Sequence, residues 1–450
     1  FLLGISQLLS LQNIDSQIAM NGMYIHDSIS HLFKGISALL VACIFIYSNN
    51  YLNTIGVSSI EFNLISLFAL LGQFIIISAY HLLLVYLGVE LLSLALVSAV
   101  ALRRDNNSSS EAAMKYFVLA ALASGFMLYG MSMIYGAVGS LDLVTISDQI
   151  ASETTNNLVL VFGLVFLLAG IGFKFGAVPF HMWVPDVYQG SSFSTALLLG
   201  SAPKIAAIAL LIRVLIEGLP DLAIHWEKMI LIMGLFSIIL GNFVAVAQSN
   251  LKRMLGYSTI SHVGFILLGF GSGLLNENLD EALKAYSSSV FYVLTYTLTV
   301  LGTFGVLLLV SNKKSDRDKI NDLKGLVNIN PLAAWCMVAF MFSMAGVPPA
   351  VGFYAKFVIL ESLISSSYII FVVLAALSSV VGAFYYLRII KVIVFDKVDN
   401  PDNSFLSQKE ISTLPKILLI FNGTAIIVFG LIPGQIMSVC VNAVQNALVF

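Results

Sequence analysis

Two stretches of the sequence decide its fold: GFKFGAVPFHMW at residues 172–183 and AGVPPAVGFYAKF at residues 345–357. They lie in apolar runs, 157–189 and 331–366, that exceed the roughly 20 helical residues needed to cross a bilayer core. Proline removes a backbone donor and clashes with the preceding turn, so each run predicts a helix interrupted near its middle. Interrupted helices at membrane depth are tolerated only beside protein or a water-filled cavity, and they are typical of ion sites.

The composition is that of a membrane protein. Of 450 residues, 59% are apolar and 10% charged, whereas soluble domains carry about 25% charged residues. Backbone polar groups cannot stay unpaired in hydrocarbon, so apolar runs of spanning length must be helices. The sequence therefore predicts an all-α polytopic membrane protein. Its twelve predicted spans are 31–49, 62–79, 82–102, 114–136, 157–189, 194–217, 228–248, 254–273, 284–310, 331–366, 367–395 and 413–440.

The basic residues sort to one side of the predicted membrane. Loops on one face carry 15 of the 22 Lys and Arg residues, and this basic face is cytoplasmic, or its organellar equivalent, by the positive-inside rule. Loops on the opposite, acidic face carry only Lys34, Arg213, Lys228 and Lys284. Three basic residues then remain inside spans: Lys174, Lys204 and Lys356.

These three lysines and Glu90 lie deep in their spans, where a charge costs about 2.5–3.5 kcal/mol at mid-helix. Snorkelling is a poor explanation for Lys174 and Lys204, which are about 15 and about 10 residues from the nearer span ends. One carboxylate cannot neutralise three ammonium groups, so at least two lysines should exchange protons near neutral pH. The residues predict a proton relay through Glu90, Lys174, Lys204 and Lys356. A static Glu90–Lys174 ion pair is the alternative.

Other polar residues are weaker candidates. His262, flanked by hydroxyl residues in YSTISHVGF, can pass a proton at physiological pH, although a helix-packing histidine explains it equally well. His181 follows the first break, and interfacial anchoring explains the aromatic residues beside it, Trp183 and Tyr188, as well as function does. Asp186 belongs to the same segment. Glu361, near a helix end, is predicted to be interfacial.

The sequence offers no site for a redox centre, a metal or a nucleotide. Cys43, Cys336 and Cys440 lie far apart in apolar runs, without a second thiol or histidine at metal-ligand spacing. No GxGxxG motif, Walker-type loop or nucleophile elbow occurs in a strand-turn-helix context. The balance of 22 basic and 24 acidic residues argues against nucleic-acid binding. Redox chemistry is expected only in partners.

The two interrupted runs are fifth and tenth along the chain, so they cross the membrane in opposite directions. This relation predicts two inverted five-helix repeats, 62–217 and 228–395, with a conducting site at the midplane between them. Residues 1–61 are predicted to hold the stub of a helix and one peripheral transmembrane helix. Residues 396–450 are predicted to hold a loop and a last transmembrane helix.

Six segments of the sequence occur in an order that is typical of one family. They are GVELLSLALV, EAAMKYFVLAALASGFMLYGMSMIYG, GFKFGAVPFHMWVPDVYQG, SAPKIAA, LKRMLGYSTISHVG and GVPPAVGFYAKF. These segments resemble antiporter-like membrane subunits of respiratory complex I, and subunit N (subunit 2 in mitochondria) in particular. The resemblance runs from about residue 20 to the end, and lysine rather than glutamate at position 356 favours subunit N over its relatives.

The resemblance implies a fourteen-helix antiporter-like fold and a proton-translocating subunit of NADH:quinone oxidoreductase. It implies that NADH, FMN, iron–sulfur clusters and quinone bind to partner subunits, and that this chain contacts other membrane subunits of complex I and the lipid bilayer. The family's proposed proton-path residues match Glu90, Lys174, Lys204 and Lys356, and His262 matches a histidine of the same motif. The family's first helix and much of its second have no counterpart here, through a truncated gene model, an alternative start or a lineage difference.

The expected mechanism is a relay: a charge change beside Glu90 and Lys174 drives a proton through Lys204 toward Lys356 and the acidic face. A cation/proton antiporter, or a subunit of one, is the main alternative because it shares these core helices. A structural spacer is the second. The bacterial inner membrane is the expected location because the motifs most resemble proteobacterial versions, with the mitochondrial inner membrane as the alternative.

Overall fold

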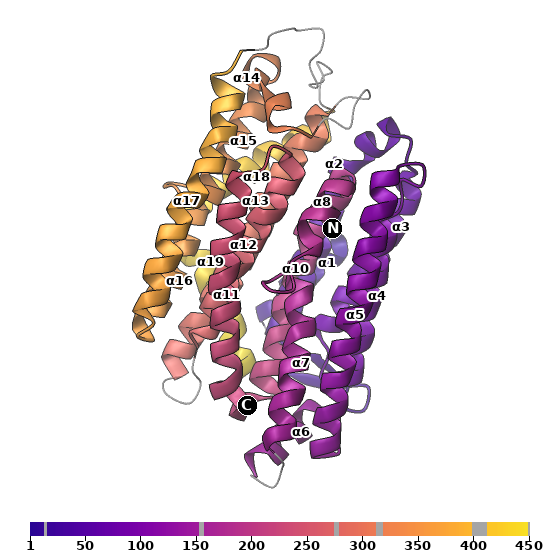
Figure 1. Cartoon of the computed structure of the whole chain (residues 1–450), viewed down its shortest axis with the longest axis vertical. Helices are drawn as coiled ribbons and strands as arrows, with labels where there is room; N and C mark the ends of the chain where they lie inside the picture. Colours follow the sequence, from indigo (N-terminus) through magenta and orange to yellow (C-terminus); the bar gives the residue numbers. More distant parts are fainter. Residues whose placement is uncertain (13–15, 153–156, 274–278, 312–317, 398–411, 449–450) are drawn as a thin grey trace.

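The computed structural model describes residues 1–12, 16–152, 157–273, 279–311, 318–397 and 412–448. Its helices lie roughly along one long axis (Figure 1). Among the described residues, eleven helices are long and apolar enough to cross a membrane, by length and composition. The predicted all-α membrane fold is confirmed.

The chain begins with a short helix and a hairpin that precede the first long helix. These elements are α1 (Leu2–Leu9), η1 (Ser10–Gln12), β1 (Gln17–Ala19), β2 (Tyr24–His26) and α2 (Ser28–Thr54). The hairpin is antiparallel, with Ile18 opposite Ile25. Asp27 begins α2 through a capping box with Ser30. The expectation that this helix is peripheral was wrong: the most apolar part of α2 is 72% buried, because helices from both parts of the chain pack against it.

The first helix group follows, and it contains two interruptions. Its elements are α3 (Ser59–Ile77), α4 (Leu82–Val100), α5 (Asn107–Val138), α6 (Leu143–Ala151), α7 (Asn157–Phe175), α8 (Trp183–Gly190), α9 (Phe193–Gly200), α10 (Ala202–Leu211), η2 (Ile212–Glu217) and η3 (Pro220–Leu222). The predicted break between α7 and α8 is confirmed and begins at Gly176 with φ of +74°. A second break at Ser201, one residue before α10, was not predicted; Pro203 lies in the first turn of α10.

The second helix group completes the molecule. Its elements are α11 (Ala223–Val246), α12 (Leu251–Gly271), α13 (Leu279–Val310), η4 (Ile320–Leu323), α14 (Leu326–Ile329), α15 (Pro331–Ala345), α16 (Val351–Ser365) and α17 (Ile369–Val394), followed by α18 (Thr413–Leu431) and α19 (Gly434–Leu448). The predicted break between α15 and α16 is confirmed. The prediction of one span over 413–440 was wrong, because Ile432 precedes Pro433 and leaves the helical conformation, with φ of −128°.

The core lies where the two groups meet. In Figure 1, α3, α4 and α5 form one side of the molecule, α16 and α17 form the other, and α10 to α13 lie between them. The spans over α12 and α13 are 94% and 89% buried, and the span from α9 to η2 is 100% buried, whereas α17 is 28% buried. The outer helices therefore present apolar side chains outward, as lipid-facing helices do, and the polar side chains gather inside.

Close helix pairs hold each group together through facing glycines. A Cβ on Gly130 of α5 would lie 2.6 Å from the Gly163 oxygen of α7. A Cβ on Gly264 of α12 would likewise lie 2.6 Å from the Gly234 oxygen of α11. Small residues let membrane helices approach this closely, so both pairs depend on glycine.

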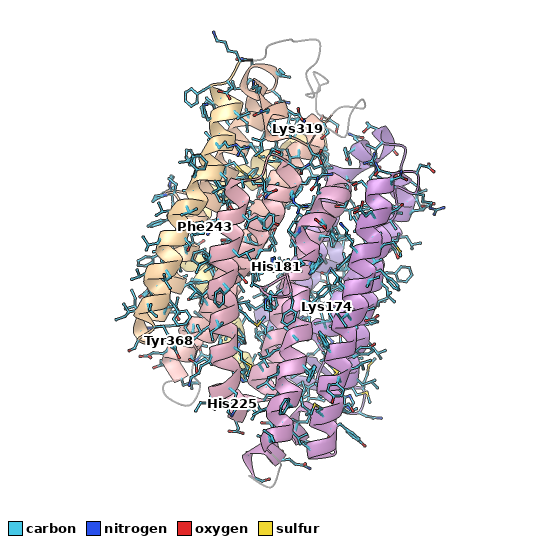
Figure 2. The ribbon with its side chains drawn as sticks, in the orientation of Figure 1. Lys174, His181, His225, Phe243, Lys319 and Tyr368 are labelled. Carbon is cyan, nitrogen blue, oxygen red and sulfur yellow. The ribbon has the colours of Figure 1, made fainter. Side chains whose placement is uncertain are left out.

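The two ends of the molecule correspond to the two predicted faces. Figure 2 places Lys319 near one end, His225 and Tyr368 near the other, and Lys174 between them. Three of the basic residues assigned to loops are nevertheless buried: Lys34, Arg213 and Lys252 are 3%, 0% and 6% exposed. Each has a polar partner inside the protein, which is why burial is tolerated.

Candidate functional site

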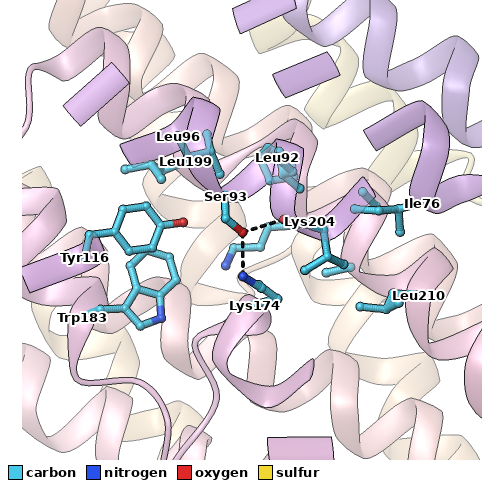
Figure 3. Close-up of a pocket in the computed structure, with 14 residues that line it drawn as sticks. Ile76, Leu92, Ser93, Leu96, Tyr116, Lys174, Trp183, Leu199, Lys204 and Leu210 are labelled. Carbon is cyan, nitrogen blue, oxygen red and sulfur yellow. Dashed lines mark hydrogen bonds between the residues drawn. The ribbon is translucent and has the colours of Figure 1, made fainter. Parts of the chain in front are cut away.

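The first break brings two of the predicted lysines into one cavity. Lys174 Nζ donates a hydrogen bond to Ser93 Oγ at 2.6 Å, and Lys204 Nζ donates to the Phe175 carbonyl oxygen at 2.8 Å. Both lysines line a cavity between α3, α4 and α10 that leaves about 30 Å³ for the centres of water molecules (Figure 3). A space of this size holds at least one water molecule, which could carry a proton between the lysines.

Proline explains why Lys204 binds at this point. In a continuous helix, the Phe175 carbonyl would accept from the residue four positions later, which is Pro179 and has no N–H. Lys204 supplies the missing donor from α10. The break therefore leaves a carbonyl oxygen without a backbone donor at membrane depth, and a lysine donates a hydrogen bond to it.

The second break repeats this chemistry with a lysine of its own. Lys356 Nζ donates to the carbonyl oxygens of Met344 at 3.1 Å and Ala345 at 3.0 Å. The residues four positions after these two carbonyls are Pro348 and Pro349, which have no N–H. A third bond, to Ser379 Oγ at 2.9 Å, gives every hydrogen of the ammonium group an acceptor.

Glu90 does not form the direct ion pair with Lys174 that the sequence suggested. Ser124 Oγ donates to Glu90 Oε2 at 2.6 Å, and no Glu90–Lys174 salt bridge occurs in the described part of the chain. Glu90 and Ser93 are one turn apart on α4, so Ser93 holds Lys174 near the carboxylate without direct contact. The two charges interact through space, separated by hydroxyl groups.

Each of the three lysines also lies over an aromatic ring. The distances from Nζ to the ring centroid are 5.5 Å for Lys174 over Phe173 and 5.4 Å for Lys356 over Phe265. Lys204 lies 5.8 Å from the centre of the Trp183 ring. An ammonium group over the face of a ring is attracted by its quadrupole, and this attraction offsets part of the cost of burial.

The aromatic residues after the first break are internal rather than interfacial. Trp183 and Tyr188 are 3% and 1% exposed, so the anchoring explanation was wrong for both. Trp183 Nε1 donates to the Phe173 oxygen at 3.0 Å, across the break. His181 lies within the break and is half-buried, and no hydrogen bond joins it to the described lysines. Glu361 is exposed on α16, as expected for an interfacial residue.

His262 lies at the centre of a network of hydroxyl groups. Its Nδ1 is 2.7 Å from Tyr292 Oη, and its Nε2 is 3.0 Å from Tyr386 Oη. Tyr386 Oη is in turn 2.5 Å from Ser258 Oγ. His262 thus bridges α13 and α17, with both ring nitrogens engaged, which is the arrangement that lets an imidazole accept a proton on one side and release one on the other.

A second chain of hydroxyl groups extends from this network toward the first break. Tyr296 Oη donates to Thr259 Oγ1 at 3.0 Å, and Thr259 Oγ1 lies 3.4 Å from Tyr188 Oη on α8. The ring of Tyr296 is 4.9 Å from that of His262. Among the described residues, however, none of the hydrogen bonds of this network reaches Lys204 or Lys356. Water must complete any proton path between the lysines and the hydroxyl groups.

Sequence reasoning missed several of these residues. Ser93 and Ser124 could have been noticed as hydroxyl groups inside apolar runs. Tyr292 and Tyr296 are spaced by four residues, which predicts a common helix face. Nothing in the sequence distinguishes Tyr386 from the other tyrosines of the chain, which has 17 in all. Arg213, which is buried with Asp27 and Glu217, was mistaken for a loop residue because it lies near the end of its apolar run.

The potential metal ligands of the described residues are scattered through the fold. No group of three or more His, Cys, Asp or Glu residues there is placed to hold a metal ion. Cys43, Cys336 and Cys440 are unpaired. The side chains gathered at the described site are lysine, carboxylate, imidazole and hydroxyl groups, all of which can donate or accept protons.

Comparison with known proteins identifies the family. Residues 79–382, which include all five candidate residues, match the family described as NADH:quinone oxidoreductase/Mrp antiporter, TM. The chain belongs to this family. A subunit N of NADH-quinone oxidoreductase from Herminiimonas arsenicoxydans is 47% identical over 434 residues, which cover 96% of this chain and 87% of that relative. The resemblance to subunit N is confirmed.

Solved structures of the family share the fold. A chain of respiratory complex I from Thermus thermophilus, with bound Aureothin, has a TM-score of 0.80 and 31% identity, covering 98% of this chain and 92% of that chain. A chain of the Mrp complex from Dietzia sp. DQ12-45-1b has a TM-score of 0.83, covering 100% and 91%. Its identity is 16%, so the Mrp likeness shows the fold alone.

Proposed function

We propose that this chain is the proton-translocating membrane subunit N of an NADH:quinone oxidoreductase. The observation that carries the proposal is the pair of helix breaks, each of which leaves carbonyl groups that a buried lysine occupies. The family and the subunit N relatives support the assignment. NADH, FMN, iron–sulfur clusters and quinone belong to partner subunits, and the chain lies among the other membrane subunits in the bacterial inner membrane.

The relay begins at Glu90 and Lys174. A charge change in the neighbouring subunit alters the field at Glu90, and Glu90 acts on Lys174 through space across Ser93 and Ser124. When the carboxylate is neutralised, the Lys174 ammonium loses its nearest stabilising charge and releases a proton. Lys204 lines the same cavity, so a water molecule there can pass the proton on.

The central hydroxyl groups connect the two helix groups. Protons leaving Lys204 travel by water to Tyr188, Thr259 and Tyr296, and then reach His262. Hydroxyl groups suit this role because each can donate and accept at once. Residues 62–217 and 228–395 would form two inverted repeats, and this network lies at their junction.

Lys356 is the last station. Its three acceptors match the three hydrogens of an ammonium group, so the protonated form is fully hydrogen-bonded and a neutral amine is not. Lys204 has one such acceptor among the described residues. A proton that arrives from the centre is therefore stabilised at Lys356 until it is displaced toward the acidic face.

Inside-out membrane vesicles containing the assembled complex test this function. Lys174→Ala should reduce NADH-driven proton pumping about tenfold or more, with quinone reduction falling as well. Lys228→Ala, which changes an exposed lysine on the acidic face, is the control and should pump normally. Normal pumping by Lys174→Ala would exclude the relay, and a sodium-dependent pH change without NADH would instead identify an antiporter.

A further inference from the structure

A buried triad of charged residues lies outside the relay, toward the acidic face. Arg213 of η2 donates from Nη2 to Asp27 Oδ1 at 2.6 Å and from Nη1 to Glu217 Oε1 at 2.5 Å. Its Nε donates to the Ile77 oxygen at 3.1 Å. The side chain of Arg213 is 0% exposed, and those of Asp27 and Glu217 are 3% exposed. Burial this complete makes the charge balance of the triad important, because one guanidinium faces two carboxylates.

Each carboxylate of the triad keeps one oxygen without a partner. Asp27 Oδ2 and Glu217 Oε2 are buried and accept no hydrogen bond from the described residues. An ionised carboxylate only accepts hydrogen bonds, and a buried acceptor without a donor is destabilising. A proton bound to one of these oxygens removes that cost in part, so the triad has a place for a proton.

The two carboxylates are held differently. Asp27 also accepts from the Ser30 backbone N–H at 2.9 Å. Burial alone would raise the pKa of the Asp27 carboxyl, but Arg213 and the hydrogen bonds from Ser30 hold this pKa below its usual value. Glu217 has only the bond from Arg213. Asp27 therefore stays ionised as the fixed partner of Arg213, and Glu217 is the carboxyl group free to exchange a proton.

The triad lies next to the cavity of the two lysines. Ile76 and Leu210 line the cavity on the side away from Trp183 (Figure 3). Ile77, one residue further, accepts from Arg213, and Arg213 follows Leu210 by three residues, which is about one helical turn or 5 Å. Arg213 and Glu217 also belong to a π-helical segment, a rare conformation that often occurs at functional sites.

Several other titratable groups face the triad from neighbouring elements. Tyr80, in the loop between α3 and α4, is close enough that burial and the Glu217 carboxyl, with smaller contributions from nearby charges, raise its pKa to about 12. Lys34 of α2 adds a second positive charge, and its Nζ donates to Tyr24 Oη at 2.7 Å. The remaining groups near this end are His26, His31, His81 and Asp142.

We propose that Glu217 is a second proton-release site, parallel to the path through Lys356, which is positioned by Arg213 and Asp27 between the cavity of Lys174 and Lys204 and the acidic face. The proton leaves a lysine ammonium, which becomes an amine, and converts the Glu217 carboxylate to a carboxylic acid. Release to water at the acidic face restores the carboxylate. This inference rests on the proposed function, because it needs the lysines to carry protons.

Glu217→Gln in the assembled complex tests the proposal. The glutamine amide oxygen can still accept from Arg213, but it cannot take up the proton. Glu227→Gln is the matched control, because Glu227 is another buried glutamate near the acidic face, 3% exposed and bonded by Tyr368 Oη. Pumping per assembled complex should fall in Glu217→Gln without being lost, because the path through Lys356 remains, and it should stay at the wild-type level in Glu227→Gln. The infrared band of a protonated carboxyl group should be lost only in Glu217→Gln.

A purely structural triad gives a different result. Asp27→Asn leaves Arg213 with Glu217 as its single charged partner, so it should lower thermal stability and weaken the infrared band. If Glu217→Gln lowers stability but leaves normal pumping per complex and an unchanged band, the triad is only structural and the proposal fails. Lys204→Ala separates this outcome from failure of the relay itself: normal pumping in that variant would overturn the proposed function, whatever Glu217→Gln does.

Discussion

The two helix breaks use the same backbone chemistry with different lysines. At the first break, the carbonyl that Pro179 leaves unbonded is occupied by Lys204 from another helix, and Lys174 beside it is held by Ser93. At the second break, Lys356 serves both free carbonyls itself. The first break therefore has two lysines sharing one cavity, whereas the second has one lysine with all of its hydrogens engaged.

This difference suggests a division of labour. Two lysines in one cavity repel each other and can exchange protons through a single water molecule, so the first break is suited to moving a proton. A lysine with three acceptors is suited to holding one. Substitutions that alter the acceptors and donors at each break should separate these two roles.

Lys356→Met should have the largest effect. It removes the donor for two carbonyls in the membrane interior, each costing about 1–3 kcal/mol when unsatisfied, and it removes the last proton station. Pumping should fall to the part that leaves through Glu217, and thermal unfolding of the purified complex should show a lower midpoint. Lys391→Met, at an exposed position of the basic face, is the control. A variant with normal pumping and stability would show that Lys356 is not the donor for these carbonyls.

Lys204→Met should abolish pumping with a smaller loss of stability. Only the Phe175 carbonyl loses its donor, so the cost should be about 1–3 kcal/mol. The measurement is the same pair of assays, pumping in vesicles and thermal unfolding. A loss of stability larger than that of Lys356→Met would contradict the hydrogen-bond comparison between the two breaks.

Gly346→Ala should affect proton transfer more than Gly176→Ala does. Both glycines have positive φ, so alanine costs roughly 1–2 kcal/mol of backbone strain at either position. A Cβ at position 346 would lie 2.9 Å from Lys356 Cδ, whereas one at position 176 would meet Val184. Gly346→Ala should therefore slow pumping per complex, and Gly176→Ala should mainly lower stability. Equal pumping rates in the two variants would show that Lys356 tolerates displacement.

Ser93→Ala should have the smallest effect. It removes one neutral partner of Lys174, a change of about 0.5–1.5 kcal/mol, which corresponds to roughly twofold to thirteenfold in rate. Ser379→Ala removes the corresponding partner of Lys356, which keeps two carbonyl acceptors, so its pumping rate should change less. Initial pumping rates at saturating NADH measure both. A larger defect in Ser379→Ala would reverse the assigned roles of the two breaks.

The sequence predicted the two helix breaks, but not which side chains donate hydrogen bonds to the carbonyl groups that the breaks leave free. Proline inside an apolar run has a local effect on its own helix, so both interruptions could be inferred from residue order alone. Which lysine reaches which carbonyl depends on helix packing, and nothing in the sequence assigns Lys204 to Phe175. The direct Glu90–Lys174 pair failed for the same reason, because Ser124 on α5 bonds Glu90 and Ser93 on α4 bonds Lys174.

Buried residues near the ends of spans could not be recognised from the sequence either. Arg213 and Lys34 lie close enough to predicted span ends to resemble loop residues, yet both are buried against polar partners from other elements. The tyrosines around His262 are similar, since tyrosine is common both at membrane interfaces and in cores. Composition and spacing give the depth of a side chain along its own helix, whereas its partners come from neighbouring helices.

The position of Lys204 over Trp183 has a spectroscopic consequence. The energy of an indole excited state depends on the local electric field, and the Lys204 ammonium lies 5.8 Å from the ring centre. Gain or loss of a proton at Lys204 therefore shifts the wavelength of the Trp183 fluorescence maximum. The chain has only two other tryptophans, Trp226 and Trp335. With both replaced by phenylalanine, light emitted from one side chain would follow the charge of the relay during turnover.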